Sequence, residues 1–363
     1  MSSIIRACKL FCSDTHNRND SAIGATTLFD ALEQNATLTN LGLRMNRIGG
    51  CPTAEDITSL ARALKRGHLA KLDLSYNDLR CRGCVILSGA LNDPSCALKE
   101  LLLEKNDISR EGVVAISNSN RTVQRLVLKG NNVGRGRGAC EAIGSMLARN
   151  KSLQFFDLSS CGIDNEGGAA IGDGLSRNST LECLLLERNS IGRGANISML
   201  IGLENSGLTE IDMNANGIGE VGSWDDAIIR AMSSSFLCRI RFSNNSLSST
   251  KIVDAIVSNA SIRIADLSDN EFESISVDTQ LALAKRLGVD LEVDLSLNPL
   301  SSPPLGKLAT HRNLLNYVTL LENERTSVKR IRLMVGSVHS VSYLYLFIFS
   351  ANALLLKGLR LWW

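Results

Sequence analysis

Proline is scarce in this chain, and so is any excess of charge of one sign. Only five prolines occur in 363 residues, so regular elements meet few forced breaks. Three of them, Pro299, Pro303 and Pro304, fall within six residues, which indicates that a regular array ends there. Basic and acidic residues number 39 and 37. This balance provides no basic face for the phosphates of nucleic acid, so we expect no nucleic-acid partner.

The sequence also lacks an apolar leader at its beginning. Arg6 and Lys9 interrupt the first ten residues, which therefore do not match a secretory signal peptide. The ten cysteines are spread over a long chain and are not clustered as in a small disulfide-rich domain. We therefore expect free thiols and a cytoplasmic protein.

A repeated leucine pattern is what the sequence has in abundance. The frame Leu-x-x-Leu-x-Leu-x-x-Asn-x-Leu occupies residues 69–79, and it returns at 98–108 and 181–191 with isoleucine in the last place. Weaker copies share the closing position, which is asparagine in all but one. The closing residues are Asn46, Asn77, Asn106, Asn131, Cys161, Asn189, Asn216, Asn245, Asn270 and Asn298. They are 25 to 31 residues apart, with a mean of 28, which indicates about ten copies of one structural unit.

Each part of the frame has a physical reason. The two leucines of Leu-x-Leu alternate with other residues, so a short strand directs both of them to the core. The asparagine amide can satisfy backbone groups at a buried corner. Helical spacing of apolar residues follows the corner, for example at 57–64, 142–147 and 165–178. One strand and one helix cannot bury their own apolar faces, but stacked copies can. We therefore expect parallel strands on a concave face and helices on a convex face.

This pattern resembles the ribonuclease-inhibitor-like class of leucine-rich repeats, whose long repeats carry a full helix. The resemblance covers roughly residues 37–300. It implies an α/β leucine-rich-repeat solenoid (horseshoe), and members of the class include ribonuclease inhibitors, the Ran GTPase-activating protein and the sensor halves of NOD-like receptors. No single member fits well. Function in such folds depends on surface sites, so the resemblance specifies the fold and not the partner.

The chain is predicted to contain four regions. Residues 1–36 form a degenerate N-terminal capping repeat, 37–300 form about ten repeats, and 301–328 form a C-terminal cap helix. Within the last region, 329–363, the 24 residues from 333 to 356 include no Asp, Glu, Lys or Arg and are long enough to span a bilayer. A tail anchor holding a cytoplasmic solenoid on a membrane is one interpretation. A packed cap and a misread end of the gene are the others.

The repeat frame also predicts which side chains face the hollow. Residues six, four and two places before the closing residue point away from the core. An apolar patch results in the middle of the array, formed by Leu102, Val127, Phe155, Cys183 and Leu185 with Asp157 among them. An acidic stretch follows, formed by Glu210, Asp212, Asp266, Glu292 and Asp294 and interrupted by Arg239 and Arg241. Both are candidate partner-binding surfaces. The alternative is that Asp-Leu-Ser, as at 157–159, is only a common solvated strand sequence.

Two local motifs suggest chemistry at first sight. The glycine-rich segment 133–139 follows a strand and opens a helix, as a phosphate-binding loop does, but segments 163–169 and 191–195 occupy the same place in their repeats. We interpret it as a repeat turn. The pair Cys81 and Cys84 has zinc-site spacing but no second pair. The sequence thus predicts no catalytic residue, no metal and no cofactor.

The leading hypothesis is a non-catalytic scaffold that binds a protein on its concave strand face, acting as a monomer. One alternative is a GTPase-activating regulator resembling the Ran activator. Another is a blocker of a basic enzyme, resembling ribonuclease inhibitor, whose binding would depend strongly on salt.

Overall fold

The chain folds as two compact units. A computed structural model describes residues 3–6, 18–119, 121–134, 137–192, 198–220, 225–234, 236–275, 279, 282, 291–295 and 297–299. Unit 1 comprises Met1–Ile191 with Ser198–Leu208, and unit 2 comprises Gly192–Ile197 with Thr209–Trp363.

Unit 1 contains a parallel sheet of short strands in sequence order. Each strand pairs with the next one along the chain, and the outward and inward positions of successive repeats stay in register, for example Leu72 opposite Leu101. The strands are β1 (Ser3–Arg6), β2 (Leu38–Gly42), β3 (Lys71–Asp73), β4 (Glu100–Leu102), β5 (Arg125–Val127), β6 (Phe155–Asp157) and β7 (Cys183–Leu185).

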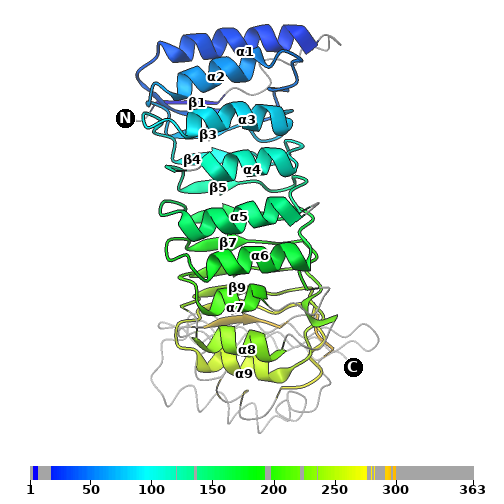
Figure 1. Ribbon diagram of the computed structural model, residues 1–363. Helices are drawn as coiled ribbons and strands as arrows, with labels where there is room; N and C mark the ends of the chain where they lie inside the picture. The colour runs from blue at the N-terminus through cyan, green and yellow to red at the C-terminus, as the bar shows by residue number, and fades with distance from the viewer. Residues whose placement is uncertain are drawn as a thin grey trace, which may run out of the picture. The chain divides into compact units, whose positions relative to one another are not determined.

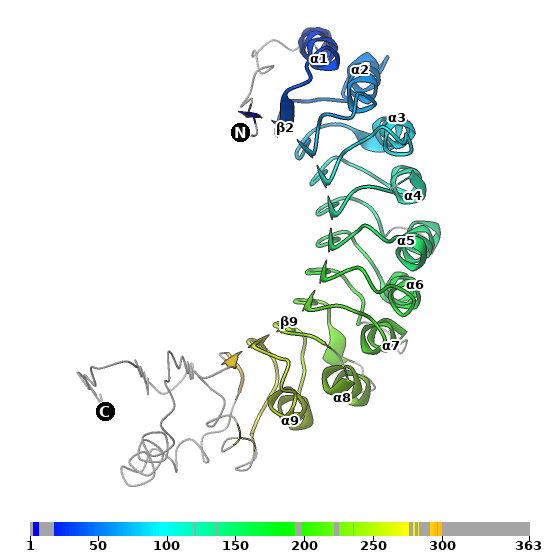
Figure 2. The same ribbon diagram turned by 90° about the vertical axis from the view of Figure 1, so that its left-hand side faces the viewer.

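A helix follows each strand from β1 to β7, and neighbouring helices pack side by side (Figure 1). Figure 2 shows the strands of unit 1 on the concave side of its curve and the helices on the convex side. The helices are α1 (Arg18–Glu33), α2 (Glu55–Leu64), α3 (Arg80–Leu91), α4 (Arg110–Ser119), α5 (Arg137–Arg149), α6 (Asn165–Leu175) and α7 (Ser198–Glu204). The strand and helix of each repeat therefore lie where the leucine frame predicts them.

Unit 2 repeats the same pattern. Strand β8 pairs with β9, β9 with β10, and β10 with β11, all in parallel. Its elements are β8 (Glu210–Asp212), a 3₁₀ turn (Ile218–Glu220), α8 (Asp225–Ser234), β9 (Arg239–Arg241), α9 (Thr250–Ser258), β10 (Ile264–Asp266) and β11 (Glu292–Asp294).

The core of each unit lies between its strands and helices. In unit 1 the leucines of the Leu-x-Leu motif, such as Leu72 and Leu74, are buried. The side chain of Ile171 in α6 is buried from the helix side. In unit 2 Phe242 has the place of Leu74, and Phe272, two residues after the closing Asn270, is also buried. Because neighbouring repeats contribute to one continuous apolar layer, no repeat has to bury a core of its own.

Buried asparagines connect one repeat to the next at the corner after most strands; Cys161 takes this place after β6. The Oδ1 atom of Asn131 accepts the backbone N–H groups of Asn106 and Ile108, at 2.9 and 3.0 Å. Its Nδ2 atom donates to the carbonyl oxygens of Leu103 and Leu128. One amide thus satisfies four backbone groups that the corner would otherwise leave without partners. Asn77 and Asn189 in unit 1, and Asn245 and Asn270 in unit 2, do the same.

The corner also imposes an unusual backbone conformation. The residue before each closing position has a positive φ, whatever its side chain; Tyr76 has φ 58° and Arg188 has φ 55°. Glycine stands at this place once, as Gly130. Left-handed conformations cost about 1–2 kcal/mol for other L-residues, so the asparagine bonds must outweigh this strain in most repeats.

The ends of the chain are described only in part. Within the predicted capping repeat 1–36, β1 pairs in parallel with β2, and Phe29 of α1 is buried. The predicted cap helix 301–328 and the tail 329–363 lie outside the described residues. Among the helices that are described, none has both the length and the apolar character needed to cross a membrane.

Candidate functional site

The strand register gathers the predicted apolar residues of unit 1 on one face. Val127 is opposite Leu102 on one side and Asp157 on the other, and Leu185 follows Asp157 on the next strand. Phe155 lies two residues earlier on the strand that carries Asp157. The four apolar side chains are half-buried, whereas Asp157 is only 7% exposed.

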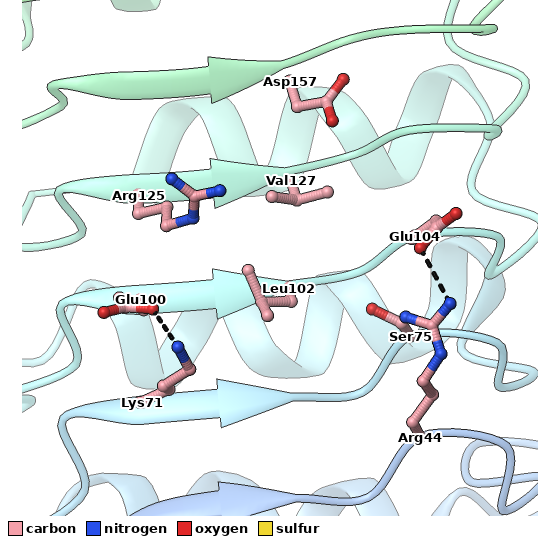
Figure 3. A pocket seen from close by; sticks show the side chains of 9 residues that line it. All are labelled: Arg44, Lys71, Ser75, Glu100, Leu102, Glu104, Arg125, Val127 and Asp157. Atoms are coloured by element: carbon pink, nitrogen blue, oxygen red, sulfur yellow. Dashed lines mark ion pairs between the residues drawn. The ribbon is translucent and has the colours of Figure 1, made fainter. Parts of the chain in front are cut away.

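A hollow of about 480 Å³ lies on this face. Figure 3 shows Leu102 and Val127 at its centre, with charged side chains around them. The lining residues are Arg44, Lys71, Ser75, Glu100, Leu102, Glu104, Arg125, Val127 and Asp157. Its floor is therefore apolar, and its border carries charge of both signs.

Most of the border charges pair within the chain. The Nζ atom of Lys71 lies 2.6 Å from a carboxylate oxygen of Glu100, and a guanidinium nitrogen of Arg44 lies 3.2 Å from one of Glu104. The Tyr76 hydroxyl also donates to Glu104, at 3.0 Å. Exposed pairs of this kind contribute about 0–1 kcal/mol each, so their main effect is to fix side-chain positions.

Arg125 makes a different contact. Its guanidinium carbon lies 3.4 Å from the centre of the Phe155 ring, which is a cation–π stack. The hollow therefore combines residues predicted from the sequence, such as Val127, with charged neighbours that were not predicted. Arg125 and Glu100 both lie in the row six places before the closing asparagine, so the repeat frame contained the signal that would have identified them.

Aspartate at the position four before the closing residue has a local structural role. The Oδ1 atom of Asp157 accepts the backbone N–H of Ser159 at 2.9 Å, and Asp73 accepts that of Ser75 in the same way. Asp212 and Asp266 repeat this bond in unit 2. An aspartate that bonds the backbone two residues later stabilises a turn. The Asp-Leu-Ser sequences therefore have a structural explanation, whereas Leu102, Val127 and Leu185 place apolar side chains at this position.

The strand face of unit 2 is organised by ion pairs. Glu210 accepts hydrogen bonds from Arg239 and Arg241, both at 2.6 Å, and Arg241 also lies 3.7 Å from Asp212. Burial works to raise the pKa of Glu210, but the hydrogen bonds from Arg241 and Arg239 together lower it. Both arginines that interrupt the acidic stretch are thus engaged within the chain.

Acidic residues remain beside these pairs. Asp266 on β10 is opposite Arg241 on one side and Asp294 on the other. Glu292 and Asp294 of β11 are exposed. On strands β8 to β11, the positions six and four before the closing residues hold two arginines and five carboxylates. The carboxylates are Glu210, Asp212, Asp266, Glu292 and Asp294. The predicted residues of unit 2 therefore form a second, acidic group on the strand face of that unit.

The motifs that suggested chemistry have packing roles where the structure describes them. A Cβ atom at Gly134 would clash with the carbonyl oxygen of Gly162 in the next repeat, so this glycine permits close stacking. Cys84 is buried, and burial followed by the neighbouring Cys81 raises the pKa of its thiol. Every cysteine in the described ranges is a free thiol. The same ranges contain no cluster of three or more His, Cys, Asp or Glu residues that could hold a metal ion.

Comparison with known proteins agrees with this repeat architecture. The family model described as Leucine Rich repeat matches residues 149–172, which run from the end of α5 through β6 into α6. The structure of the TLR13–ssRNA13 complex superposes with a TM-score of 0.50 at 17% identity, over 85% of this chain and 38% of that chain. At this identity the likeness shows the fold alone.

The similar curated proteins carry the same kind of repeat. The chain is 36% identical over 140 residues to Leucine-rich repeat-containing protein 45 of Gallus gallus, and 23% identical over 232 residues to Ribonuclease inhibitor of Mus musculus. It is 31% identical over 130 residues to NACHT, LRR and PYD domains-containing protein 13 of Homo sapiens. These alignments cover 36%, 56% and 34% of this chain, but only 20%, 51% and 12% of the relatives.

The relatives and the structure lead to one conclusion. Parallel strands recur with a buried asparagine at every corner but one, and ribonuclease inhibitors and NACHT-domain proteins share the sequence pattern. The chain is a leucine-rich-repeat protein of the ribonuclease-inhibitor-like class, with the fold of a protein-interaction scaffold.

Proposed function

We propose that this chain is a non-catalytic protein that binds a protein partner on the strand face of unit 1. The observation that carries the proposal is the row of half-exposed Leu102, Val127 and Leu185. At this position four other repeats have an aspartate, Asp73, Asp157, Asp212 or Asp266, that bonds its own backbone. Three repeats have an apolar side chain in place of the local turn bond; Leu102 and Val127 are adjacent in the register, and Asp157 separates them from Leu185. Apolar surface gathered on one face of a protein marks an interaction site.

The surroundings of this row suit a protein interface. Interfaces typically have an apolar centre and a polar rim that keeps water away from it. Here the Lys71–Glu100 and Arg44–Glu104 pairs flank the centre and leave little net charge beside it. Because parallel strands hold every side chain in a fixed register, the surface is rigid before binding, which reduces the entropy lost on association.

The composition of the hollow supports a binding role more than a chemical one. Its nine lining residues include no histidine and no cysteine. Its one hydroxyl residue, Ser75, is buried and donates its backbone N–H to Asp73. Acyl or phosphoryl transfer at such a place would need a base beside the nucleophile.

Affinity capture with matched variants tests the proposal. The full-length tagged protein, Leu102→Asp and Leu185→Asp are compared by quantitative mass spectrometry of the bound proteins. Val85→Asp is the control, because Val85 is a comparably apolar side chain that is 52% exposed on helix α3. Partners lost from both strand variants and kept by Val85→Asp support the strand face. Retention of the same partners by all three variants contradicts it.

A ribonuclease-inhibitor-like blocker of a basic enzyme is the second candidate. It is favoured by the acidic strand face of unit 2 and by the ribonuclease inhibitors of Mus musculus and Sus scrofa among the relatives, at 23% and 27% identity. Asp212, Asp266 and Asp294 would attract a basic surface and increase the association rate. Binding of pancreatic-type ribonuclease that weakens steeply with added salt would support this candidate, and binding insensitive to salt would contradict it.

A GTPase-activating role stays a prediction from the family resemblance. It would act on a partner's active site, not through chemistry of this chain. Assays of GTP hydrolysis by small GTPases, with and without this protein, test it directly. Faster hydrolysis would replace the scaffold proposal.

We also propose that the protein is monomeric and cytoplasmic, and that segment 329–363 attaches it to a membrane. The free cysteines of the described ranges support the cytoplasmic location. The molar mass in solution, measured by light scattering, tests whether the protein is a monomer. Fractionation of the tagged protein, with and without residues 329–363, tests the attachment, and a fully soluble full-length chain would contradict it.

A further inference from the structure

One row of side chains on the strand face of unit 1 forms an ion pair and a cation–π contact that the sequence does not predict. Lys71, Glu100, Arg125 and Phe155 are register neighbours on β3, β4, β5 and β6. Glu100 lies between two cations, and it pairs with Lys71 at 2.6 Å. Arg125, on its other side, stacks on the ring of Phe155.

This arrangement leaves Arg125 with an unmatched charge. Among the ion pairs that the described residues make, none includes Arg125, whereas Arg44 and Lys71 of the same hollow each have a carboxylate. A guanidinium that lies over a ring presents its N–H groups at its edge, in its own plane. Those N–H groups match the two oxygens of a carboxylate, in the bidentate geometry that arginine favours.

Apolar side chains lie beside this guanidinium. Val127 is two residues later on the same strand, and Leu102 is opposite Val127 on β4. Figure 3 shows both next to Arg125 in the hollow. An apolar group bound on Leu102 and Val127 would displace water from around Arg125, which strengthens a charge-assisted hydrogen bond there.

The other carboxylates of the hollow limit where a partner's acid can bind. Glu100 and Glu104 are paired with Lys71 and Arg44. Asp157 carries the remaining negative charge; it lies opposite Val127 on β6, two register positions along the strands from Arg125 (Figure 3). A second carboxylate would be repelled there, so the Arg125 end is the favourable place.

We propose that the hollow binds a protein segment in which a carboxylate side chain lies next to an apolar side chain. The carboxylate pairs with Arg125, and the apolar side chain rests on Leu102 and Val127. Positions two apart on a strand are separated by roughly 7 Å. The two groups of the partner are therefore two residues apart in an extended segment, or three to four apart on a helix. This inference rests on the proposed function, since it names the chemistry of the partner for the same surface.

Selection from a random peptide library tests the inference without a known partner. Peptides displayed on phage are selected on the full-length protein, and the dissociation constants of the enriched peptides are measured by fluorescence polarisation. The same peptides are then measured with Arg125→Glu, Arg125→Gln and Leu102→Asp. Arg121→Glu is the matched control, because Arg121 is an exposed arginine in the same repeat. Melting curves establish whether each variant is folded. If Arg125→Glu is not folded, Arg125→Gln removes the positive charge without placing a second carboxylate opposite Glu100.

The expected result is a shared pattern of Asp or Glu two to four residues from a large apolar residue. Affinity for these peptides should fall about tenfold or more in Arg125→Gln and Arg125→Glu, and stay unchanged in Arg121→Glu. Replacing the acidic residue of the peptide by lysine should restore binding to Arg125→Glu.

Two results would overturn the inference in distinguishable ways. One result is a set of enriched peptides that need Leu102 but contain no acidic residue, or that bind Arg125→Glu as tightly as the unchanged protein. It would disprove the pairing of a partner carboxylate with Arg125 and leave the proposed function intact. The absence of any peptide whose binding depends on Leu102 would contradict the docking surface itself, and the inference with it.

Discussion

The thiol of Cys161 donates to the carbonyl oxygen of Leu128 at 3.2 Å, in the place where other repeats have an asparagine amide. Cysteine therefore replaces the hydrogen bond that the Nδ2 atom of an asparagine would donate here. The hydrogen bond that an Oδ1 atom would accept is weaker, because the backbone N–H of Asn131 donates to a sulfur atom instead of an amide oxygen. In the preceding repeat, Asn131 supplies that oxygen to two N–H groups.

Restoring the amide should stabilise the protein. We expect Cys161→Asn to raise the free energy of unfolding by about 1 kcal/mol, the usual net contribution of a buried hydrogen bond. The denaturation midpoint measures it. Cys140→Asn is the control, since Cys140 is equally buried but holds no corner position, and it should destabilise the chain. Equal effects of the two substitutions would contradict the role of the corner.

The same thiols should make the protein sensitive to alkaline pH. Burial raises the pKa of Cys161 and of Cys140 to about 12, from an ordinary value of 9.0. Below pH 9 both thiols keep their protons whether the chain is folded or not. Between pH 9 and about 12 only the unfolded chain releases them, so stability falls as the pH rises, by up to about 1.4 kcal/mol per pH unit for each thiol.

Denaturation midpoints measured across this pH range test the linkage. The stability advantage of Cys161→Asn over the unchanged protein should widen as the pH rises above 9, because the variant has one such thiol fewer. An advantage that stays constant with pH would show that Cys161 does not titrate as its burial requires.

Close packing of helices α6 and α7 depends on Gly172. A Cβ atom at this position would lie 2.5 Å from the Cα atom of Met199 and from the carbonyl oxygen of Ser198. Backbone atoms cannot yield as a flexible side chain does, so we expect Gly172→Ala to destabilise the chain by about 1–3 kcal/mol.

Gly89→Ala is the matched control for helix propensity. Gly89 is exposed in helix α3, and a Cβ atom there would meet nothing within 4 Å. This change should stabilise the protein by about 0.5–1 kcal/mol, because alanine favours a helix over glycine. Thermal denaturation of both variants distinguishes the cases; a stabilising Gly172→Ala would mean that the two helices can separate at little cost.

Periodicity made much of the fold predictable. The closing asparagines had to be buried, because only a corner that stacks on its neighbour uses both ends of an amide; Asn77 and Asn245 have this position. The alternation of Leu72 and Leu74 with polar residues likewise determined which side of a strand faces the core. Both follow from short-range geometry that repeats with the sequence.

The candidate site was less predictable. Glu100 has a cation on each side in its row, and nothing in the sequence states that it pairs with Lys71 and leaves Arg125 to stack on Phe155. That choice depends on side-chain conformations of similar energy. The division into two units was also hidden, because Asn189 and Asn216 are 27 residues apart, an ordinary repeat length.

The strand face of unit 2 should depend on Glu210 at neutral pH. Burial would raise the pKa of this carboxyl, but the hydrogen bonds from Arg241 and Arg239 outweigh burial and lower it. Its contribution to stability is therefore present at pH values above the pKa that Glu210 has in the unfolded chain. It is lost as the pH falls through the pKa that Glu210 has in the folded chain.

We expect Glu210→Gln to lower the stability by roughly 0.5–1 kcal/mol at pH 7, since the pairs are partly exposed and screened by solvent. The difference should shrink in acid, where the unchanged protein also loses the charge, and in high salt. Glu271→Gln, at an exposed glutamate of the same unit, should have no such effect. Denaturation midpoints of both variants at neutral and acidic pH measure this. A deficit for Glu210→Gln that persists in acid would mean that the contribution of Glu210 comes from packing, and that its charge does not hold the two arginines in place.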